Sequence, residues 1–592
     1  MIYRAPITDI AFALKHATRL SPAARDAELS AGPGNDLIHA VLEQAGRFAG
    51  DVIAPLNAIG DRHGARFADG EVCMPPGWKE AYRAWAAAGW NGLAAPTAWG
   101  GQGLPHTLNA ACLEMWNSAA MAFGLGPLLT MSAVEALAAH GSEELKNLYL
   151  PKLVSGEWMG TMQLTEPQAG SDLSLLRTRA ERAGDGSYLI TGQKIFITYG
   201  EHDLTENIIH FVLARLPDAP AGNRGISLFL VPKFLLKPDG SPGPRNDLRA
   251  HSLERKLGIH ASPTCTMIYG DNGGATGFLV GEEHRGLACM FTMMNLARLA
   301  VGVQGVAIAE RATQQAFAYA CERKQGRLAT RDGAEAAPII VHPDVRRMLL
   351  SMRSLTRASR ALCYLTAAEI DRSREAADSA ERKAAHERAS LLTPLAKAFS
   401  SDAGIQVASL GVQVHGGMGY IEETGAAQHL RDARITAIYE GTNGIQGIDL
   451  VTRKLPLGGG APVKQLLHDL RQVVDAVNGN NDPLFGWTGL RLSEALDSLQ
   501  RSGEWLLAQL ESSPQTALAG ATPYLQLFGI TAGGALLAQE ALAARRINNG
   551  DAAGRIAIAR FFAEHFAVTA PALEREIIEG GGSVRDCEAA LS

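Results

Sequence analysis

The sequence predicts a mainly α-helical protein with a central β-domain and a C-terminal helical extension, and three observations support this. The chain has 592 residues, whereas hydrophobic cores rarely grow beyond about 250–300 residues before a chain divides. Apolar residues recur at helical spacing in residues 34–158 and 286–455, while residues 159–285 hold short β-rich runs separated by turns. Residues 463–592 are again rich in Ala and Leu at helical spacing.

The regions before and after this body are predicted from turn residues. Residues 1–33 form an amphipathic stretch that ends in a turn-rich Ala-Gly-Pro-Gly segment, which predicts a short arm packed on the body. Residues 456–462 read PLGGGAP and predict a linker. The predicted units are therefore an arm (1–33), a helical domain (34–158), a β-domain (159–285), a helical bundle (286–455) and an extension (463–592).

Five runs carry the β-domain prediction. They are rich in β-branched and aromatic residues and are bounded by Gly, Pro and Asp, as strands usually are. The runs are residues 188–191, 195–198, 208–213, 226–231 and 266–269.

Composition excludes several classes of protein. Hydrophobic residues make up 46% and charged residues 20% of the chain, and the net charge is −6, which gives no attraction to nucleic acid. The seven cysteines and the scattered histidines lack the spacing of a disulfide framework or a metal site, so we expect reduced thiols, no metal and a cytoplasmic protein. No uninterrupted apolar run reaches about 18 residues, which predicts no membrane-spanning segment, and no targeting segment is visible.

Residues 438–446, which read IYEGTNGIQ, form the most informative segment. Glu440 is followed by Gly441, which lets backbone approach a ligand closely, and by Thr442, whose hydroxyl suits either a cofactor or a helix cap. Taken alone, the segment also fits a helix N-terminus capped by Thr442 with Glu440 as a solvated acid.

Three further segments change that balance. Residues 162–172 read MQLTEPQAGSD, residues 194–198 read KIFIT, and residues 413–420 read QVHGGMGY. With residues 438–446 they resemble, in order and spacing, the signature segments of acyl-CoA dehydrogenases. The resemblance covers about residues 34–455. The opening residues 3–9, YRAPITD, and the long C-terminal extension resemble the 3-(methylthio)propanoyl-CoA dehydrogenase group within this family.

The resemblance implies a helical domain, a β-barrel-like domain and a four-helix bundle. The resemblance also implies FAD. No side chain accepts hydride, so a flavin or nicotinamide must do so, and the lack of a GxGxxG turn argues against a Rossmann dinucleotide site. Glu440 would remove the α-proton of an acyl-CoA, flavin N5 would accept the β-hydride, and an electron-transfer flavoprotein would reoxidise the flavin in fatty acid metabolism. Some relatives carry their base at the position that matches Ala297. Alanine cannot accept a proton, so Glu440 is the candidate base that the resemblance gives.

The family's functional positions carry over residue by residue. Phe196 stands where a tryptophan is usual, so it can cover a ring face without an indole N–H. For the substrate, Ser171, Arg298 and Gly441 match, although Arg298 equally fits a structural salt bridge. The matching cofactor positions are Met162, Leu164, Thr165, Ser171, Phe196, Thr198, Arg323, Gln413, Gly416, Gly417 and Thr442.

The resemblance also implies an oligomer. In the family, the segment matching Gln413, Gly416 and Gly417 reaches the FAD of a neighbouring subunit, and Arg323 belongs to the same contact. Exposed glycine backbone suits a phosphate. We therefore expect a homodimer, with a tetramer as the alternative.

Two other functions remain open on the sequence alone. An acyl-CoA oxidase would use the same scaffold and differ in how oxygen reaches the reduced flavin. A catalytically silent protein that binds flavin or acyl-CoA would be expected to have lost the base or the flavin contacts. The sequence also leaves the acyl group of the substrate undecided, because one methylene changes binding by only about 1–3 kcal/mol. The methylthiopropanoyl thioester is the first candidate, and straight medium or long chains are the next.

Overall fold

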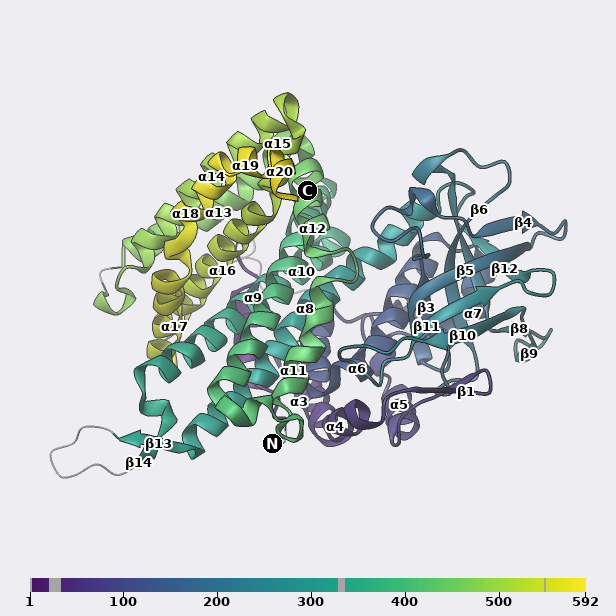
Figure 1. The fold of residues 1–592 in the computed structure, drawn as a ribbon, viewed down its shortest axis with the longest axis horizontal. Helices are drawn as coiled ribbons and strands as arrows, with labels where there is room; N and C mark the ends of the chain where they lie inside the picture. Colours follow the sequence, from purple (N-terminus) through teal and green to yellow (C-terminus); the bar gives the residue numbers. More distant parts are fainter. Residues whose placement is uncertain (1–2, 21–33, 328–335, 481, 548–549, 592) are drawn as a thin grey trace.

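The computed structural model describes residues 3–20, 34–327, 336–480, 482–547 and 550–591. In Figure 1 the β-domain lies on one side of a bundle of long helices, and the C-terminal helices lie on the other side. This arrangement confirms the predicted fold class, mainly helical with a central β-domain.

The N-terminal region is helical apart from one small hairpin that the sequence reasoning missed. Helix α6 is nearly all buried, and its backbone leaves helical geometry at Ala120 (φ −157°, ψ 102°). The helices are α3 (Asn35–Phe48), α4 (Ala54–His63), α5 (Trp78–Ala87), α6 (His106–His140) and α7 (Glu143–Ser155), and the hairpin is β1 (Arg66–Ala68) with β2 (Glu71–Cys73).

The arm contributes helix α1 (Ile7–His16), which packs between the bundle and the C-terminal extension. Phe12 lies in a small apolar cluster with Ala543 and Ala544 of the extension. Residues 21–33, the second half of the predicted arm, lie outside the described part of the chain.

The β-domain is a closed barrel with its own core. Strand β5 (Tyr188–Thr198) contains two of the predicted runs, and β6 (Ile208–Arg215), β7 (Ile226–Pro232) and β11 (Thr264–Tyr269) contain the other three. Pairings β5–β12, β12–β7, β7–β6, β6–β4 and β4–β5 close a ring, which β10, β11 and β3 extend. The remaining strands are β3 (Met159–Gln163), β4 (Arg179–Arg182), β8 (Phe234–Leu236), β9 (Pro242–Arg245), β10 (Leu248–Leu253) and β12 (Ala275–Val280).

The bundle is built on three long helices, α8 (Gly286–Glu322), α9 (Pro343–Glu375) and α10 (Ser379–His415). Glycines let α8 and α10 approach closely, since a Cβ on Gly305 would lie 2.2 Å from the Ser400 carbonyl oxygen and one on Gly302 would lie 2.6 Å from that of Ala396. This contact sets neighbouring turns of the two helices side by side. Shorter elements are β13 (Lys324–Arg327), β14 (Ala336–Pro338), α11 (Ala426–Ala433) and α12 (Asn443–Asp449).

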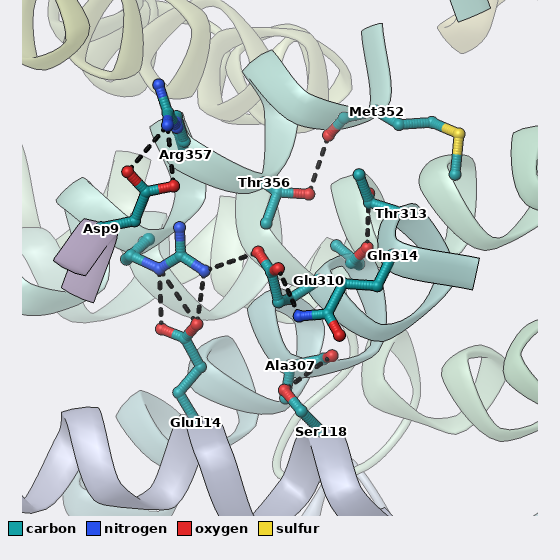
Figure 2. A network of polar contacts seen from close by, with 12 residues as sticks. Asp9, Glu114, Ser118, Ala307, Glu310, Thr313, Gln314, Met352, Thr356 and Arg357 are labelled. Carbon is teal, nitrogen blue, oxygen red and sulfur yellow. Dashed lines mark hydrogen bonds and ion pairs between the residues drawn. The ribbon is translucent and has the colours of Figure 1, made fainter. Parts of the chain in front are cut away.

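Buried charges hold the arm, α6, α8 and α9 together (Figure 2). The Arg360 guanidinium donates to Glu114 at 2.6 and 3.0 Å and to Glu310 at 2.8 Å, and the Tyr364 hydroxyl donates to Glu114 at 2.6 Å. Glu114 is fully buried, and these hydrogen bonds offset the cost of burying its carboxyl group.

The extension is an antiparallel helical unit on the outer face of the bundle. The predicted linker is packed at its end, where Gly460 and Pro462 are buried, whereas Pro456, Gly458 and Gly459 are exposed. The extension contains α13 (Ala461–Asn478), α14 (Thr488–Ser512), α15 (Pro514–Ala519), α16 (Ala521–Arg546), α17 (Ala552–His565), α18 (Ala570–Glu579), α19 (Gly581–Arg585) and α20 (Glu588–Leu591).

The sequence argument against a membrane-spanning segment was too strict. By length and composition alone, four described helical stretches could cross a membrane: His106–His140, Gly286–Glu322, Ala521–Arg546 and Ala552–Glu579. The protein itself buries 94%, 67%, 94% and 44% of their most apolar windows. Interruptions by single polar residues hid these stretches from a test of uninterrupted runs.

Candidate active site

Glu440 lies on a tight turn between the 3₁₀-helix η9 (Arg434–Ala437) and helix α12. Its φ is +57°, and that of the following Gly441 is +82°. A left-handed conformation is costly for a residue with a side chain, about 1–3 kcal/mol, and persists only where neighbours enforce it. Thr442 then caps α12, since its Oγ1 accepts from the Ile445 N–H at 3.2 Å. Thr442 is therefore a helix cap, and the turn that it ends also carries Glu440.

Side-chain donors hold the carbonyl groups of this turn. The Gln446 Nε2 donates to the carbonyl oxygens of Glu440 and Gly441, each at 3.2 Å. The Lys397 ammonium of α10 donates to the Gly441 carbonyl oxygen at 2.8 Å and to the Asn443 Oδ1 at 2.9 Å. The peptide planes on both sides of the Gly441 Cα are thus fixed from outside the turn.

The electrostatic surroundings of Glu440 suit a proton acceptor. Burial raises the pKa of Glu440 to about 7, against the opposing effects of Arg298 and Lys397. A carboxyl group with a pKa near neutrality is a better general base than one near 4. The Glu440 carboxylate is therefore both mostly buried and close to its titration point at physiological pH.

Arg298 is buried on α8 and joins the same cluster. Its Nη1 lies 3.6 Å from Asp449 Oδ2 on α12. Burial lowers the pKa of Arg298, and Asp449 and Glu440 oppose that shift. Arg298 therefore forms a structural salt bridge and also lies beside the candidate base. Ala297, where some relatives carry their base, is fully buried and has no titratable group.

A buried polar chain runs from the base segment into the helices behind it. The Tyr439 hydroxyl donates to Gln304 Oε1, and the Gln304 Nε2 donates to Asn117 Oδ1 at 3.3 Å. Asn117 precedes the irregular turn of α6 at Ala120, and its Nδ2 donates to the Leu113 carbonyl at 2.8 Å.

The predicted flavin segments meet at one end of the barrel. Met162 is buried on β3, and Leu164 and Thr165 follow in the loop. The Thr165 carbonyl accepts from the Ile195 N–H at 2.9 Å, and the Leu164 carbonyl accepts from the buried Lys194 ammonium at 3.1 Å. Ser171 is exposed further along the same loop.

The conformation of Phe196 fits a bound aromatic cofactor. Phe196 sits inside β5, yet its φ is +60° and 59% of it is exposed. An extra residue in β5 opposite β11 marks a bulge at this point, because Cys265 pairs with Ile197 and Met267 with Lys194. Bulges re-aim side chains, and here an aromatic ring is turned out of the sheet two residues before Thr198. An exposed aromatic ring and a hydroxyl group at this position fit the flavin ring of FAD, which needs an apolar surface and polar partners.

The other four predicted residues lie elsewhere in the chain's own fold. Arg323, Gln413, Gly416 and Gly417 are all exposed at the far ends of α8 and α10. Lys397, beside the Glu440 turn, and Gly416 are 19 residues apart along α10, about 28 Å at 1.5 Å per residue. A Cβ on Gly416 or Gly417 would meet nothing within 4 Å. One subunit therefore does not bring these four residues to Glu440.

Sequence reasoning missed three residues of the site, Lys397, Gln304 and Asn117. Each lies in a long helical segment of apolar and small residues, for example LLTPLAKAFS around Lys397. A single charge or amide within such a segment was the available signal, since buried polar groups need partners. In the part of the chain that the structure describes, no group of three His, Cys, Asp or Glu side chains could hold a metal ion.

Protein-family models cover most of the chain. Models of the acyl-CoA dehydrogenase N-terminal, middle and C-terminal domains match residues 36–157, 161–272 and 284–455, and an acetyl-CoA dehydrogenase C-terminal-like model matches residues 462–588. A 3-methylmercaptopropionyl-CoA dehydrogenase of Ruegeria pomeroyi is 48% identical over 592 residues, 99% of each chain.

Solved structures share the whole fold. Caenorhabditis elegans ACDH-11 in complex with C11-CoA has a TM-score of 0.77 at 20% identity, over 98% of this chain and 95% of that one. An acyl-CoA dehydrogenase of Bacillus anthracis complexed with FAD has a TM-score of 0.76 at 21% identity, over 94% of this chain and 91% of that one. The chain belongs to the acyl-CoA dehydrogenase family and is an FAD-dependent oxidoreductase.

Proposed function

We propose that this acyl-CoA dehydrogenase converts 3-(methylthio)propanoyl-CoA to its 2-enoyl-CoA, with Glu440 as the base. The observation that carries the role of Glu440 is its enforced left-handed turn, on which a mostly buried carboxyl group has a pKa of about 7. The full-length similarity to the Ruegeria pomeroyi enzyme supports the substrate. The polar chain from Tyr439 to Asn117 supports a short acyl group, because a long one would have to displace buried hydrogen bonds.

In this mechanism the Glu440 carboxylate takes the α-proton of the thioester. When bound, FAD supplies the acceptor for the hydrogen that leaves Cβ as hydride, so the two departing hydrogens leave a Cα=Cβ bond. The fixed carbonyls of the turn keep the Glu440 backbone in place while the proton moves. Arg298 and Gly441 lie beside the carboxylate, where we assign them to the acyl-CoA, and Ser171 lies on the loop after β3.

Thr198, Phe196 and the loop of Leu164 and Thr165 would hold the flavin ring at the barrel. Gln413, Gly416, Gly417 and Arg323 would contact the FAD of a second subunit. The separation of about 28 Å along α10 supports this, because these groups cannot reach a cofactor beside Glu440 of their own chain. We therefore propose a homodimer in which each cofactor site is completed by the partner.

An electron-transfer flavoprotein would accept the electrons. Oxidase activity would instead give one peroxide per turnover, so peroxide formation in air decides between these acceptors. The seven cysteines, all within the described residues and all unpaired, support a cytoplasmic location for this reaction.

The decisive experiment is anaerobic mixing of the FAD-loaded protein with 3-(methylthio)propanoyl-CoA and with straight-chain acyl-CoAs, followed by flavin absorbance. We expect the methylthio substrate to bleach the flavin fastest and Glu440→Gln to abolish bleaching while keeping the flavin. Glu511→Gln, an exposed acid in α14 of the extension, is the control. Rapid bleaching of Glu440→Gln would overturn the base, and faster bleaching by octanoyl-CoA would overturn the substrate.

A further inference from the structure

Among the residues that the structure describes, two lysines are fully buried, and they differ in their partners. Lys194 lies 2.8 Å from the Glu166 carboxylate. Lys397 donates only to neutral oxygens, the Gly441 carbonyl at 2.8 Å and the Asn443 amide at 2.9 Å. Among the described residues, no carboxylate oxygen lies within 4.0 Å of the Lys397 ammonium group. Burying an ammonium group without such a partner is costly, and neutral donors could satisfy the same two oxygens.

We infer that Lys397 is a positioning residue for the base: it holds the left-handed turn of Glu440 through the Gly441 carbonyl and places a buried ammonium group beside that turn. This inference rests on the proposed role of Glu440 as base. It adds a residue from α10, a helix that bears none of the predicted residues next to the base.

The mechanical part follows from the backbone. Glu440 and Gly441 have successive positive φ values, +57° and +82°. Gln446 holds the carbonyls of both residues from α12, which belongs to the same local segment. Lys397 ties this turn to a different helix, α10, from a stretch of that helix that is buried. Asn443 accepts a hydrogen bond from the same ammonium group and donates to Asp402 Oδ1 at 2.7 Å. Its side chain therefore adds a second link between the turn and α10.

The electrostatic part follows from the charges packed around the carboxylate. Arg298 faces it from α8 and Lys397 from α10, both favouring its ionised form. Arg298 is paired with Asp449, which also pairs with Arg453, so its field is partly neutralised. Asp402 acts on Lys397 from one turn further along α10. Burial lowers the pKa of Lys397 to about 7, and Glu440 and Asp402 oppose that shift.

The test is the pH profile of anaerobic flavin reduction by 3-(methylthio)propanoyl-CoA in Lys397→Met, a substitution of similar length without charge or donor. We expect the acid limb of the profile to move up by about one pH unit, because removing one nearby cation raises a carboxyl pKa by about that amount or more. At pH 7, a shift of the pKa of Glu440 from about 7 by one unit upwards lowers the ionised fraction of this carboxyl group, and with it the reduction rate, about fivefold.

Lys454→Met is the matched control, since Lys454 is a partly buried lysine of the same region that donates to Ser390 rather than to the turn. Its acid limb should stay in place. If Lys397→Met retains no FAD, Lys397→Gln keeps a donor for the buried oxygens, removes the cation and should show the same shift. An unmoved acid limb and a full rate in the variant that folds would overturn the inference.

The two proposals fail in different ways. If the flavin of Glu440→Gln is reduced at the normal rate, Glu440 is not the base, and the role of Lys397 is refuted with it. If Glu440→Gln is inactive but the Lys397 variant has the pH profile and rate of the wild type, Glu440 remains the base and only the role of Lys397 is refuted. A lysine with a merely structural role would lower FAD content or thermal stability without moving the limb.

Discussion

Asp9 in the N-terminal arm accepts hydrogen bonds of 2.8 and 2.7 Å from Arg357, which lies 348 positions later in the chain. Arg555 of the C-terminal extension donates to the same carboxylate at 2.8 Å. One side chain thus joins the arm, the bundle (Figure 2) and the extension. Both arginines are buried, and Asp9 shares the balancing of their charge with Glu540 and Asp551.

Replacing Asp9 should therefore destabilise the junction. Burial alone would raise the pKa of Asp9, but Arg357, Arg360 and Arg555 outweigh it and lower the pKa to about 2. A depressed acid pKa adds stability above the unfolded value near 4, and this stability is lost as pH falls from about 4 to 2. We expect Asp9→Asn to cost about 2–3 kcal/mol at pH 7.

Thermal unfolding at pH 7 and pH 3 measures this effect. The deficit of Asp9→Asn should shrink at the lower pH. Asp36→Asn, an exposed acid in the first turn of α3, serves as control. Equal melting of wild type and Asp9→Asn at pH 7 would contradict the role of the arm.

Glu440→Gln should be more stable than the wild type at alkaline pH. The pKa of Glu440 is raised to about 7, so its stability contribution is present below the unfolded value near 4.5 and is lost as pH rises through 7. Above that pH the wild type keeps a buried charge that glutamine removes. We expect a gain of about 1–3 kcal/mol at pH 8 and a smaller one at pH 5, measured by chemical unfolding of the FAD-free protein. A gain that does not change with pH would show that Glu440 titrates normally.

Phe196→Ala should weaken FAD binding while leaving the FAD-free protein nearly as stable. With 59% of Phe196 exposed, its ring has little packing to lose within the chain, so we expect a change within about 0.5 kcal/mol. Equilibrium dialysis of FAD and thermal melting measure the two effects separately. Trp487→Ala, an exposed aromatic residue of the extension, should alter neither. A large loss of stability with unchanged FAD affinity would assign Phe196 to the barrel instead.

Tyr420→Glu should convert the proposed dimer to monomers with reduced FAD content. Tyr420 is 85% exposed, and Met418 and Ile421 beside it are also exposed, so the segment after Gly417 presents apolar side chains to solvent. A carboxylate buried there on association would be strongly unfavourable. Analytical ultracentrifugation measures the change, with Leu591→Glu as the exposed control at the other end of the chain. Dimers of unaltered affinity would place the interface elsewhere.

Gln304→Ala should shift the acyl preference towards longer chains. The substitution removes the link between Tyr439 and Asn117 and adds room behind the base. We expect the kcat/KM ratio of hexanoyl-CoA to 3-(methylthio)propanoyl-CoA to rise about tenfold, in the range that one or two methylenes contribute. Gln315→Ala, on the same helix but bonded to the Thr424 carbonyl, is the control. An unchanged ratio would remove this polar chain from the substrate pocket.

Much of the fold could be predicted from local patterns. Helical and strand periodicity distinguished the β-domain from its helical neighbours, because alternation along the chain reports which face of each element is buried. The strands that escaped prediction, such as β3 and β4, are short or flanked by polar residues. Their pairing depends on distant partners rather than on their own composition.

For the site, the sequence by itself determined the family, the FAD requirement and the candidate base, because short segments such as IYEGT carry backbone and side-chain features that no other part of the chain supplies. Tertiary structure alone decided what surrounds that base. Lys397 comes within reach of Gly441 because α12 and the turn before it pack against α10, and Gln304 meets Tyr439 across 135 residues. The burial that raises the pKa of Glu440 comes from the same packing, and packing between distant segments cannot be read from any one of them.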